Sequence, residues 1–173
     1  MHRAVQHPNV VNVFGAGMVG NEPYLAMEYV PGVDLHRLLR LFASENRTLS
    51  ASVMAYIARS VACALDAVHS ACDPQGMPLN ITHGDVSPSN IYLSIAGEVK
   101  LGDFGIAHAA RSPQSEAKAP ASGEVLKGKV GYLAPELLKG GPIDQRCDIF
   151  ALGVVLGEML MGERVFSGSG PLA

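Results

Sequence analysis

The stretch that decides the fold runs from Thr82 to Asn90 and reads Thr-His-Gly-Asp-Val-Ser-Pro-Ser-Asn. Asp-Phe-Gly begins thirteen residues after Asn90, at Asp103. Asp85 is a carboxylate that could accept the proton of a hydroxyl group, while Asn90 and Asp103 offer the hard oxygen atoms that Mg²⁺ prefers. Phosphoryl transfer needs such a set, because it depends on an oriented nucleophile and on metal ions that bridge phosphate oxygens. The pattern therefore predicts a phosphoryl-transfer site.

Three further segments keep the order that a known enzyme family has. His-Pro-Asn-Val-Val occupies residues 7–11, Ala-Pro-Glu occupies 134–136, and Asp-Ile-Phe-Ala-Leu-Gly occupies 148–153. Each motif alone has an ordinary structural interpretation, such as a turn or a helix start with proline in first position. Taken in order with residues 82–90 and 103–105, they resemble the protein kinase domain, most of all the eukaryotic-type serine/threonine kinases of bacteria. The resemblance covers essentially the whole chain.

This resemblance implies an α+β, protein kinase-like fold. Residues 1–30 would be a remnant of the N-lobe with its last strands and the hinge, and residues 31–173 a mostly helical C-lobe that runs through the buried central helix. Only six residues precede the 7–11 segment, so we expect the glycine-rich loop, the strand lysine and its glutamate partner to be missing. The helices beyond the central helix are expected to be missing too. The domain is thus expected to be incomplete, with exposed apolar faces.

Residue patterns predict the individual elements. Strands are expected over residues 10–14, 24–30, 90–94 and 98–101, with a turn at 21–23 between the first two. Asp34 is placed to cap a short helix that reaches Phe42. Residues 145–161 are apolar nearly all the way round, which predicts a helix buried on every side. A helix that begins after Ser50 is expected to bury a stripe made of Val53, Ile57, Val61, Ala64, Leu65 and Val68.

The resemblance also assigns the groups that would bind ATP and Mg²⁺. Asp85 would be the catalytic base, and Asn90 and Asp103 would hold the metal. Asp34 would lie near the ribose. Tyr92 stands where the family tends to place an aliphatic residue under the adenine, so it would narrow the base pocket or point aside. The gatekeeper and hinge, whose backbone would bind the adenine, would be Met27, Glu28, Tyr29 and Val30.

Four residues have structural roles by the same resemblance. His83 and Phe104 would pack in the internal spine of the domain, and Asp148 would anchor the backbone of the catalytic loop from the buried helix. Glu136 would pair with an arginine of the missing C-terminal part. Without that partner, a buried carboxylate at this position would be costly.

Three positions depart from the family pattern. Gly84 stands where the family usually has an arginine that grips a phosphorylated activation loop, so control by such phosphorylation is not expected. Ser87 stands where serine/threonine kinases usually carry a lysine, and Lys129 where they usually carry a threonine. We therefore hypothesise that Lys129 reaches towards Asp85 and supplies the charge that position 87 lacks. The alternative is a lysine that simply faces solvent.

Composition excludes several classes of protein. Thirteen basic and sixteen acidic side chains give a formal charge of −3, so nothing favours a nucleic-acid partner or an anionic membrane surface. The apolar run at 149–157 is too short to span a bilayer, and the first residues do not form a secretory signal. Three cysteines without a Cys-x-x-Cys pair predict neither a disulfide framework nor a zinc site. We expect a cytoplasmic protein.

Three functions remain open at this point. The first is a serine/threonine protein kinase that transfers the γ-phosphoryl group of ATP to a protein hydroxyl, weakly or not at all if its phosphate-clamping parts are missing. The second is a non-catalytic, pseudokinase-like module that binds a partner. The third is a small-molecule kinase of the aminoglycoside or choline type, whose loop also reads His-Gly-Asp. The segments at 103–105 and 134–136 favour a protein substrate and rank this last.

Overall fold

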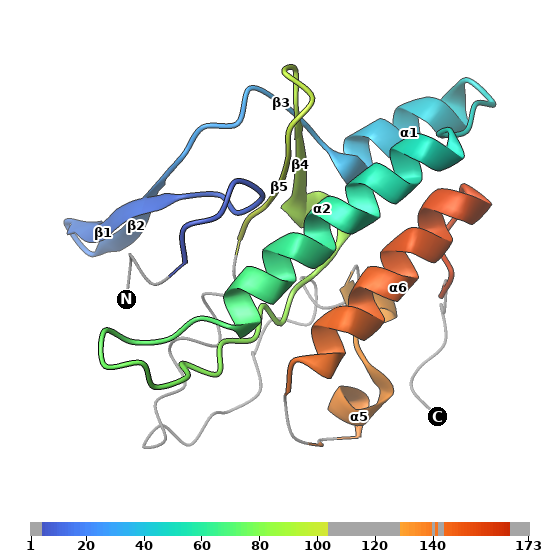
Figure 1. Cartoon of the computed structure of the whole chain (residues 1–173). Helices are drawn as coiled ribbons and strands as arrows, with labels where there is room; N and C mark the ends of the chain where they lie inside the picture. The colour runs from blue at the N-terminus through green and yellow to red at the C-terminus, as the bar shows by residue number, and fades with distance from the viewer. Residues whose placement is uncertain (1–4, 104–128, 140, 142–143, 167–173) are drawn as a thin grey trace.

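The computed structural model describes residues 5–103, 129–139, 141 and 144–166. Strands β1 (Val13–Val19) and β2 (Glu22–Met27) form an antiparallel hairpin, and β3 (Gly32–Asp34), β4 (Ile91–Ser94) and β5 (Val99–Leu101) form a second antiparallel sheet in that order. Helices α1 (Leu35–Ser44), α2 (Ala51–His69) and α6 (Arg146–Met161) lie beside one another as a helical layer (Figure 1). The α+β class is confirmed.

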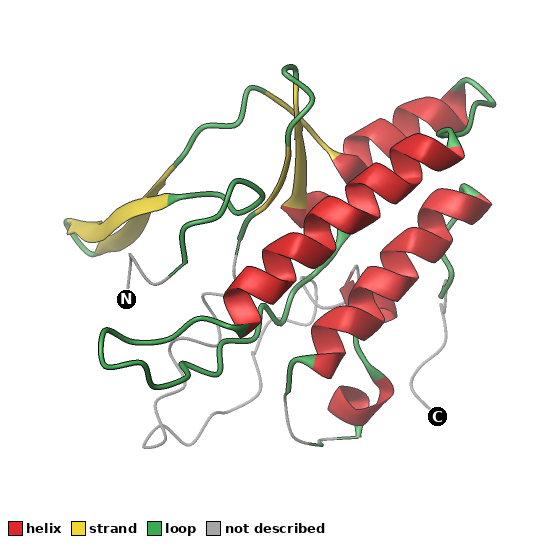
Figure 2. Ribbon diagram, viewed as in Figure 1, coloured by secondary structure: helices red, strands yellow, loops and turns green. Residues whose placement is uncertain are grey.

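Short elements connect these layers. A 3-10 turn, η1 (Pro88–Asn90), leads into β4, and a second one, η2 (Val130–Tyr132), precedes the short helix α5 (Pro135–Leu138). In Figure 2 helix dominates the part of the chain that follows β3, and strands dominate the part before it. The division of the chain into an N-lobe remnant over residues 1–30 and a C-lobe over 31–173 stays a prediction.

Local capping explains where two of the helices begin. The Asp34 carboxylate accepts a hydrogen bond from the backbone N–H of Arg37 at 2.7 Å, and the Ser50 hydroxyl accepts one from the N–H of Val53 at 3.4 Å. Each side chain thereby satisfies a donor that the first helical turn would leave without a partner. Both starts were predicted from the sequence.

The buried stripe of α2 differs from the predicted one at its first position. Val53 is 41% exposed, whereas Met54 is only 6% exposed. A helix turns by about 100° per residue, which places Met54 nearer than Val53 to the centre of the stripe. The rest of the stripe is confirmed, and it packs against α6 and β5. α2 is also long and apolar enough to cross a membrane by length and composition alone, a test that the core helix of a soluble protein passes as well.

The prediction that α6 is buried on all sides is wrong. Ile149, Leu160 and Met161 are 54%, 61% and 54% exposed, while Val155 and Met159 on the opposite side are almost fully buried. Within the described residues α2 and η2 pack on one side of α6, and the ring of Phe166, from the segment that follows the helix, stacks on Phe150. The exposed apolar surface that the sequence led us to expect is therefore present along this helix.

The first two strands lie elsewhere than predicted. β1 begins at Val13 and continues through Gly15 and Gly17 to Val19, whereas the predicted strand ended at residue 14; β2 ends at Met27. The turn falls at residues 20–21 because Val19 pairs with Glu22, and Gly20 has a positive φ of +61° there. Val10 instead forms a parallel bridge with Leu101, which ties the start of the chain to β5. The strands predicted over 90–94 and 98–101 are confirmed to within a residue.

Candidate active site

The loop that carries Asp85 is anchored through its backbone by the side chain of Asp148. This side chain lies on the first turn of α6 and is 1% exposed. Its Oδ2 accepts hydrogen bonds from the backbone N–H of His83 at 2.8 Å and from Nε2 of His69 at 2.8 Å. Its Oδ1 accepts one from the backbone N–H of Gly84 at 2.8 Å. The contacts expected of Asp148 are present, and they fix the backbone immediately before Asp85.

His83 connects this loop to the strand that ends at Asp103. Its fully buried ring accepts a hydrogen bond at Nδ1 from the backbone N–H of Asp85 at 3.2 Å, and Nε2 lies 3.0 Å from the carbonyl oxygen of Gly102. Burial lowers the pKa of His83, which outweighs the opposing effect of Asp148. A neutral ring with one donor and one acceptor suits these two contacts. His83 thus holds the two predicted catalytic segments together from inside.

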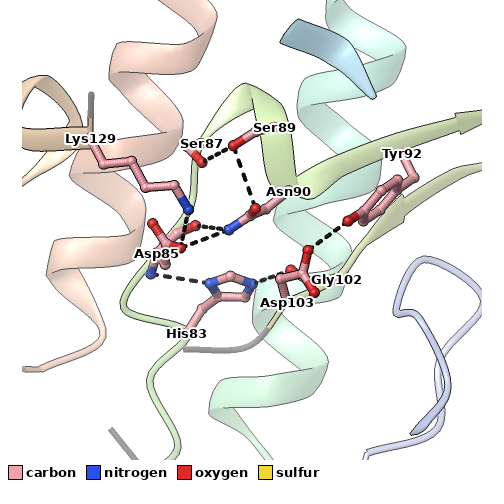
Figure 3. A network of polar contacts seen from close by, with 9 residues as sticks. All are labelled: His83, Asp85, Ser87, Ser89, Asn90, Tyr92, Gly102, Asp103 and Lys129. Atoms are coloured by element: carbon pink, nitrogen blue, oxygen red, sulfur yellow. Dashed lines mark hydrogen bonds and ion pairs between the residues drawn. The ribbon is translucent and has the colours of Figure 1, made fainter. Parts of the chain in front are cut away.

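Asp85 is reached by two side chains from opposite directions (Figure 3). Asn90 Nδ2 donates to the Asp85 carbonyl oxygen at 2.8 Å and to its Oδ2 at 2.9 Å. Lys129 Nζ forms an ion pair with the same Oδ2. The Asp85 and Lys129 side chains are 29% and 36% exposed, so the pair is open to solvent. The contact that the sequence analysis predicted for Lys129 is present, and its part in catalysis stays a prediction.

Ser87 lies beside this pair without joining it. The residue is 2% exposed, and its hydroxyl pairs with Ser89 Oγ at 3.1 Å. Among the contacts of the described residues, the positive charge next to Asp85 comes from Lys129 and none comes from position 87. Ser87 therefore contacts its own loop, and the role predicted for positions 87 and 129 in catalysis stays a prediction.

Asp103 has a partner that the sequence analysis missed. The Tyr92 hydroxyl donates to Asp103 Oδ2 at 2.6 Å, so its tip reaches the predicted metal ligand (Figure 3). Burial raises the pKa of Tyr92, and the hydrogen bond to Asp103 raises it further, which keeps the hydroxyl protonated as a donor. Asp103 itself has a φ of +55°, in the left-handed region that few residues other than glycine adopt. The sequence feature that could have indicated this contact is Gly102, because a residue without a side chain leaves space for the Tyr92 ring.

The donor chemistry of this region fits Mg²⁺. Asp103 offers a carboxylate and Asn90 an amide oxygen, because the Asn90 nitrogen is bound to Asp85 and its oxygen has only a long contact of 3.5 Å from the Ser89 hydroxyl. Mg²⁺ is usually bound by one or two carboxylates together with phosphate oxygens and water. In the described part of the chain no three His, Cys, Asp or Glu side chains gather as a metal cage. A site of the open type, completed by a nucleotide, agrees with both observations.

The predicted gatekeeper and hinge begin at Met27, the last residue of β2, and continue past the end of that strand. Tyr29 is 85% exposed, Met27 is 37% exposed, and Val30 is half-buried. Glu28 is held by Lys100 of β5 through an ion pair of 2.8 Å and by two hydrogen bonds of 3.1 Å from Asn12. Burial alone would raise the pKa of Glu28, but Lys100 and Asn12 outweigh it and hold the pKa below its usual value. The sequence analysis missed Lys100. This residue lies on β5, a strand whose three residues are all buried.

Glu136 is not buried, its pairing with an arginine stays a prediction, and another glutamate of this region is buried. Glu136 lies in the first turn of α5 and is exposed, so it carries no burial cost. Glu158 of α6 is 6% exposed, and its carboxylate accepts a short hydrogen bond from the Tyr132 hydroxyl. Sequence motifs pointed to the glutamate of Ala-Pro-Glu, whereas the packing of η2 on α6 buries Glu158. Phe104 lies outside the described residues.

Comparison with known proteins agrees with this geometry. A family model described as the protein kinase domain matches residues 1–171. The chain is 40% identical to the tyrosine-protein kinase MasK of Myxococcus xanthus, over 96% of this chain and 25% of that protein. It is 37% identical to the probable serine/threonine-protein kinase CE0033 of Corynebacterium efficiens, over 98% and 24%. It is 33% identical to the serine/threonine-protein kinase PknB of Mycobacterium tuberculosis, over 98% and 25%. The chain spans about a quarter of the length of these curated relatives.

Proposed function

The chain belongs to the protein kinase family, and from this premise we propose that it transfers the γ-phosphoryl group of ATP to a serine or threonine hydroxyl of a protein. The observation that carries the proposal is the environment of Asp85. Its loop is fixed from below by Asp148, and its carboxylate is held between Asn90 and Lys129 while remaining open to solvent. A carboxylate whose backbone is fixed and whose side chain remains accessible can orient an incoming hydroxyl group.

The reaction assigns one task to each of these side chains. The acceptor oxygen forms a bond to the γ-phosphorus, the bond from that phosphorus to the β–γ bridging oxygen breaks, and ADP leaves. The acceptor proton passes to the Asp85 carboxylate. Asn90 and Asp103 would hold Mg²⁺, which neutralises charge on the phosphate oxygens when it is bound. Positioning and electrostatics supply most of the catalysis in such reactions, so the geometry around Asp85 is expected to decide the rate.

Lys129 would supply the positive charge at this centre. The family carries a lysine at the position of Ser87, but Ser87 is buried here and engaged with Ser89. Lys129, which directly precedes η2, forms its ion pair with the Asp85 carboxylate. An ammonium group beside Asp85 can contact both that carboxylate and a transferring phosphoryl group, whose charges are negative. We therefore assign to Lys129 the task that a catalytic-loop lysine performs in the family.

Nucleotide binding and phosphate transfer test the proposed function together. We expect Mg²⁺-ATP to raise the melting temperature of the purified chain and radiolabelled phosphate to appear on a generic protein substrate such as casein. Asp85→Asn should keep the thermal shift and lose the transfer, because the base does not contribute to nucleotide binding. Phosphoamino acid analysis would identify the acceptor. Absence of both the thermal shift and the label would contradict the proposal.

A matched pair of lysine variants tests the role of Lys129. Lys129→Met should reduce phosphate transfer by about tenfold to a hundredfold, whereas Lys139→Met should leave it unchanged, since Lys139 is an exposed lysine at the end of α5. The exchange Ser87→Lys with Lys129→Thr should recover part of the loss, because it returns one positive charge to the site. Equal effects of the two methionine variants on phosphate transfer would contradict the proposed role of Lys129.

The acceptor residue is the finer part of the proposal. CE0033 and PknB are named serine/threonine kinases, while MasK is named a tyrosine kinase. We favour serine and threonine because the segment from residue 82 to 90 resembles the catalytic loop of bacterial serine/threonine kinases. Phosphotyrosine as the sole product would overturn this choice and leave the kinase assignment in place.

A non-catalytic binding module is the second candidate. The exposed apolar side chains of α6 favour it, because a contiguous apolar face of this kind often marks a contact surface. The outcome that separates the two candidates is a chain that neither shifts its melting temperature with Mg²⁺-ATP nor transfers phosphate.

A further inference from the structure

We propose that Tyr92 is a positioning residue that fixes the Asp103 carboxylate for metal binding. This inference rests on the proposed function, which makes Asp103 a metal ligand. Tyr92 lies on β4, two residues after Asn90, so one short stretch of chain supports both predicted ligands. Its hydroxyl donates to Asp103 Oδ2 at 2.6 Å, as Figure 3 shows. The family pattern gives position 92 an aliphatic side chain, which has no such donor.

The glycine at 102 makes this contact possible. A Cβ atom at Gly102 would lie 2.9 Å from Tyr92 Cε2 and 2.9 Å from Val11 Cγ2, closer than real side chains allow. The Tyr92 ring therefore occupies space that a side chain at position 102 would need. Gly102 is itself fixed on both sides, because its N–H donates to the Asn90 carbonyl at 3.0 Å and its carbonyl oxygen faces His83 Nε2 at 3.0 Å.

The contact has two consequences for Asp103. The hydroxyl engages Oδ2, which leaves Oδ1 to face a metal ion, so the carboxylate is presented in one orientation. The backbone of Asp103 has a φ of +55°, a conformation that costs free energy for a residue with a side chain and therefore needs a partner to hold it. Groups that hold a metal ligand from behind typically change metal affinity by tenfold to a hundredfold when they are removed.

Terbium binding tests this role without nucleotide or substrate. Tb³⁺ prefers hard oxygen ligands as Mg²⁺ does, and its luminescence under direct excitation reports binding to wild type and variants alike. We expect Tyr92→Phe to weaken Tb³⁺ binding by about tenfold, because it keeps the ring and removes only the donor. Asp103→Asn should abolish this binding. Gly102→Ala should weaken it in the same direction, because the added methyl group displaces the ring.

Tyr56→Phe is the matched control. The Tyr56 hydroxyl donates to the carbonyl oxygen of Gly97 at 3.0 Å, so this variant also loses one hydroxyl contact, but away from Asp103. It should bind Tb³⁺ as wild type does. Circular dichroism melting of each variant separates a loss of metal affinity from a loss of fold.

Two results would overturn the inference. One is a folded Tyr92→Phe variant that binds Tb³⁺ as tightly as wild type and Tyr56→Phe do. The other is binding that survives Asp103→Asn, which would place the ion elsewhere. Phosphate transfer is not part of this experiment, so the two proposals can fail separately. If Tb³⁺ binding depends on Tyr92 but the chain transfers no phosphate, the proposed function is contradicted and the role of Tyr92 is supported.

Discussion

Two carboxylates meet at one loop and have opposite environments: Asp85 belongs to the loop, and Asp148 contacts its backbone from the first turn of α6. Asp148 is 1% exposed and accepts two backbone N–H donors together with the His69 ring. Asp85 is 29% exposed and is contacted by two side chains, Asn90 and Lys129. Backbone donors cannot move away without unfolding the loop, whereas side chains can change rotamer. The loop is therefore held by its buried carboxylate and left adjustable at its exposed one.

The difference also has an energetic side. Removing a carboxylate from water costs several kcal/mol, so a buried one persists only when its lone pairs are satisfied. Asp148 meets this condition through three donors at 2.8 Å. An exposed ion pair such as Lys129–Asp85 contributes only about 0–1 kcal/mol to stability. Asp148 therefore stabilises the fold, whereas Asp85 is the carboxylate that we propose for the chemistry.

The largest expected effect on stability is that of Asp148→Asn. The amide has one acceptor oxygen where the carboxylate has two, and its nitrogen would face a backbone N–H, so we expect a loss of about 3 kcal/mol in the free energy of unfolding. Asp85→Asn should change it by less than about 1 kcal/mol. Urea denaturation of both variants measures this. Equal losses would show that the two carboxylates do not differ as proposed.

Tyr132→Phe is expected to have an intermediate effect. It removes the donor to Glu158, a buried carboxylate on the same helix as Asp148, and should cost about 1–3 kcal/mol. The more exposed Tyr56→Phe should cost less than about 1 kcal/mol. Chemical denaturation of the pair decides whether burial of the acceptor sets the size of the loss. If Tyr56→Phe cost as much as Tyr132→Phe, burial would not be the cause.

Glu28→Gln should have the smallest effect, and one that depends on pH. The pKa of Glu28 is lowered in the folded chain from its ordinary value of 4.5, so its pairing with Lys100 stabilises the fold fully above that value. The stabilisation is lost as pH falls through the lowered pKa. We expect wild type to exceed Glu28→Gln by up to about 1 kcal/mol near pH 7 and the difference to shrink below pH 4.5. A difference that stays constant down to pH 3 would exclude this pair as its source.

The sequence predicted those features that depend on neighbouring residues or on motif order. The caps at Asp34 and Ser50 are local, so they follow from a few residues. The meeting of Lys129 with Asp85, 44 residues apart, followed from the resemblance, which assigns both positions to one site.

Features set by packing between distant elements could not be predicted. Tyr92 points to Asp103 because Gly102 leaves space for its ring, and Lys100 meets Glu28 because β5 is buried throughout. Neither fact is visible in a local pattern. The exposure of Ile149 on α6 depends on what covers that helix, which hydropathy alone does not reveal.

The exchange of charge between positions 87 and 129 has an evolutionary consequence. Ser87→Lys alone would place two ammonium groups near one carboxylate, and two like charges about 4 Å apart repel by about 1–4 kcal/mol. Lys129→Thr alone would leave none. Each single change away from the present pair therefore leaves two positive charges near Asp85 or none. From the proposed role of Lys129 we expect the two positions to be epistatic, so that Ser87 and Lys129 change together.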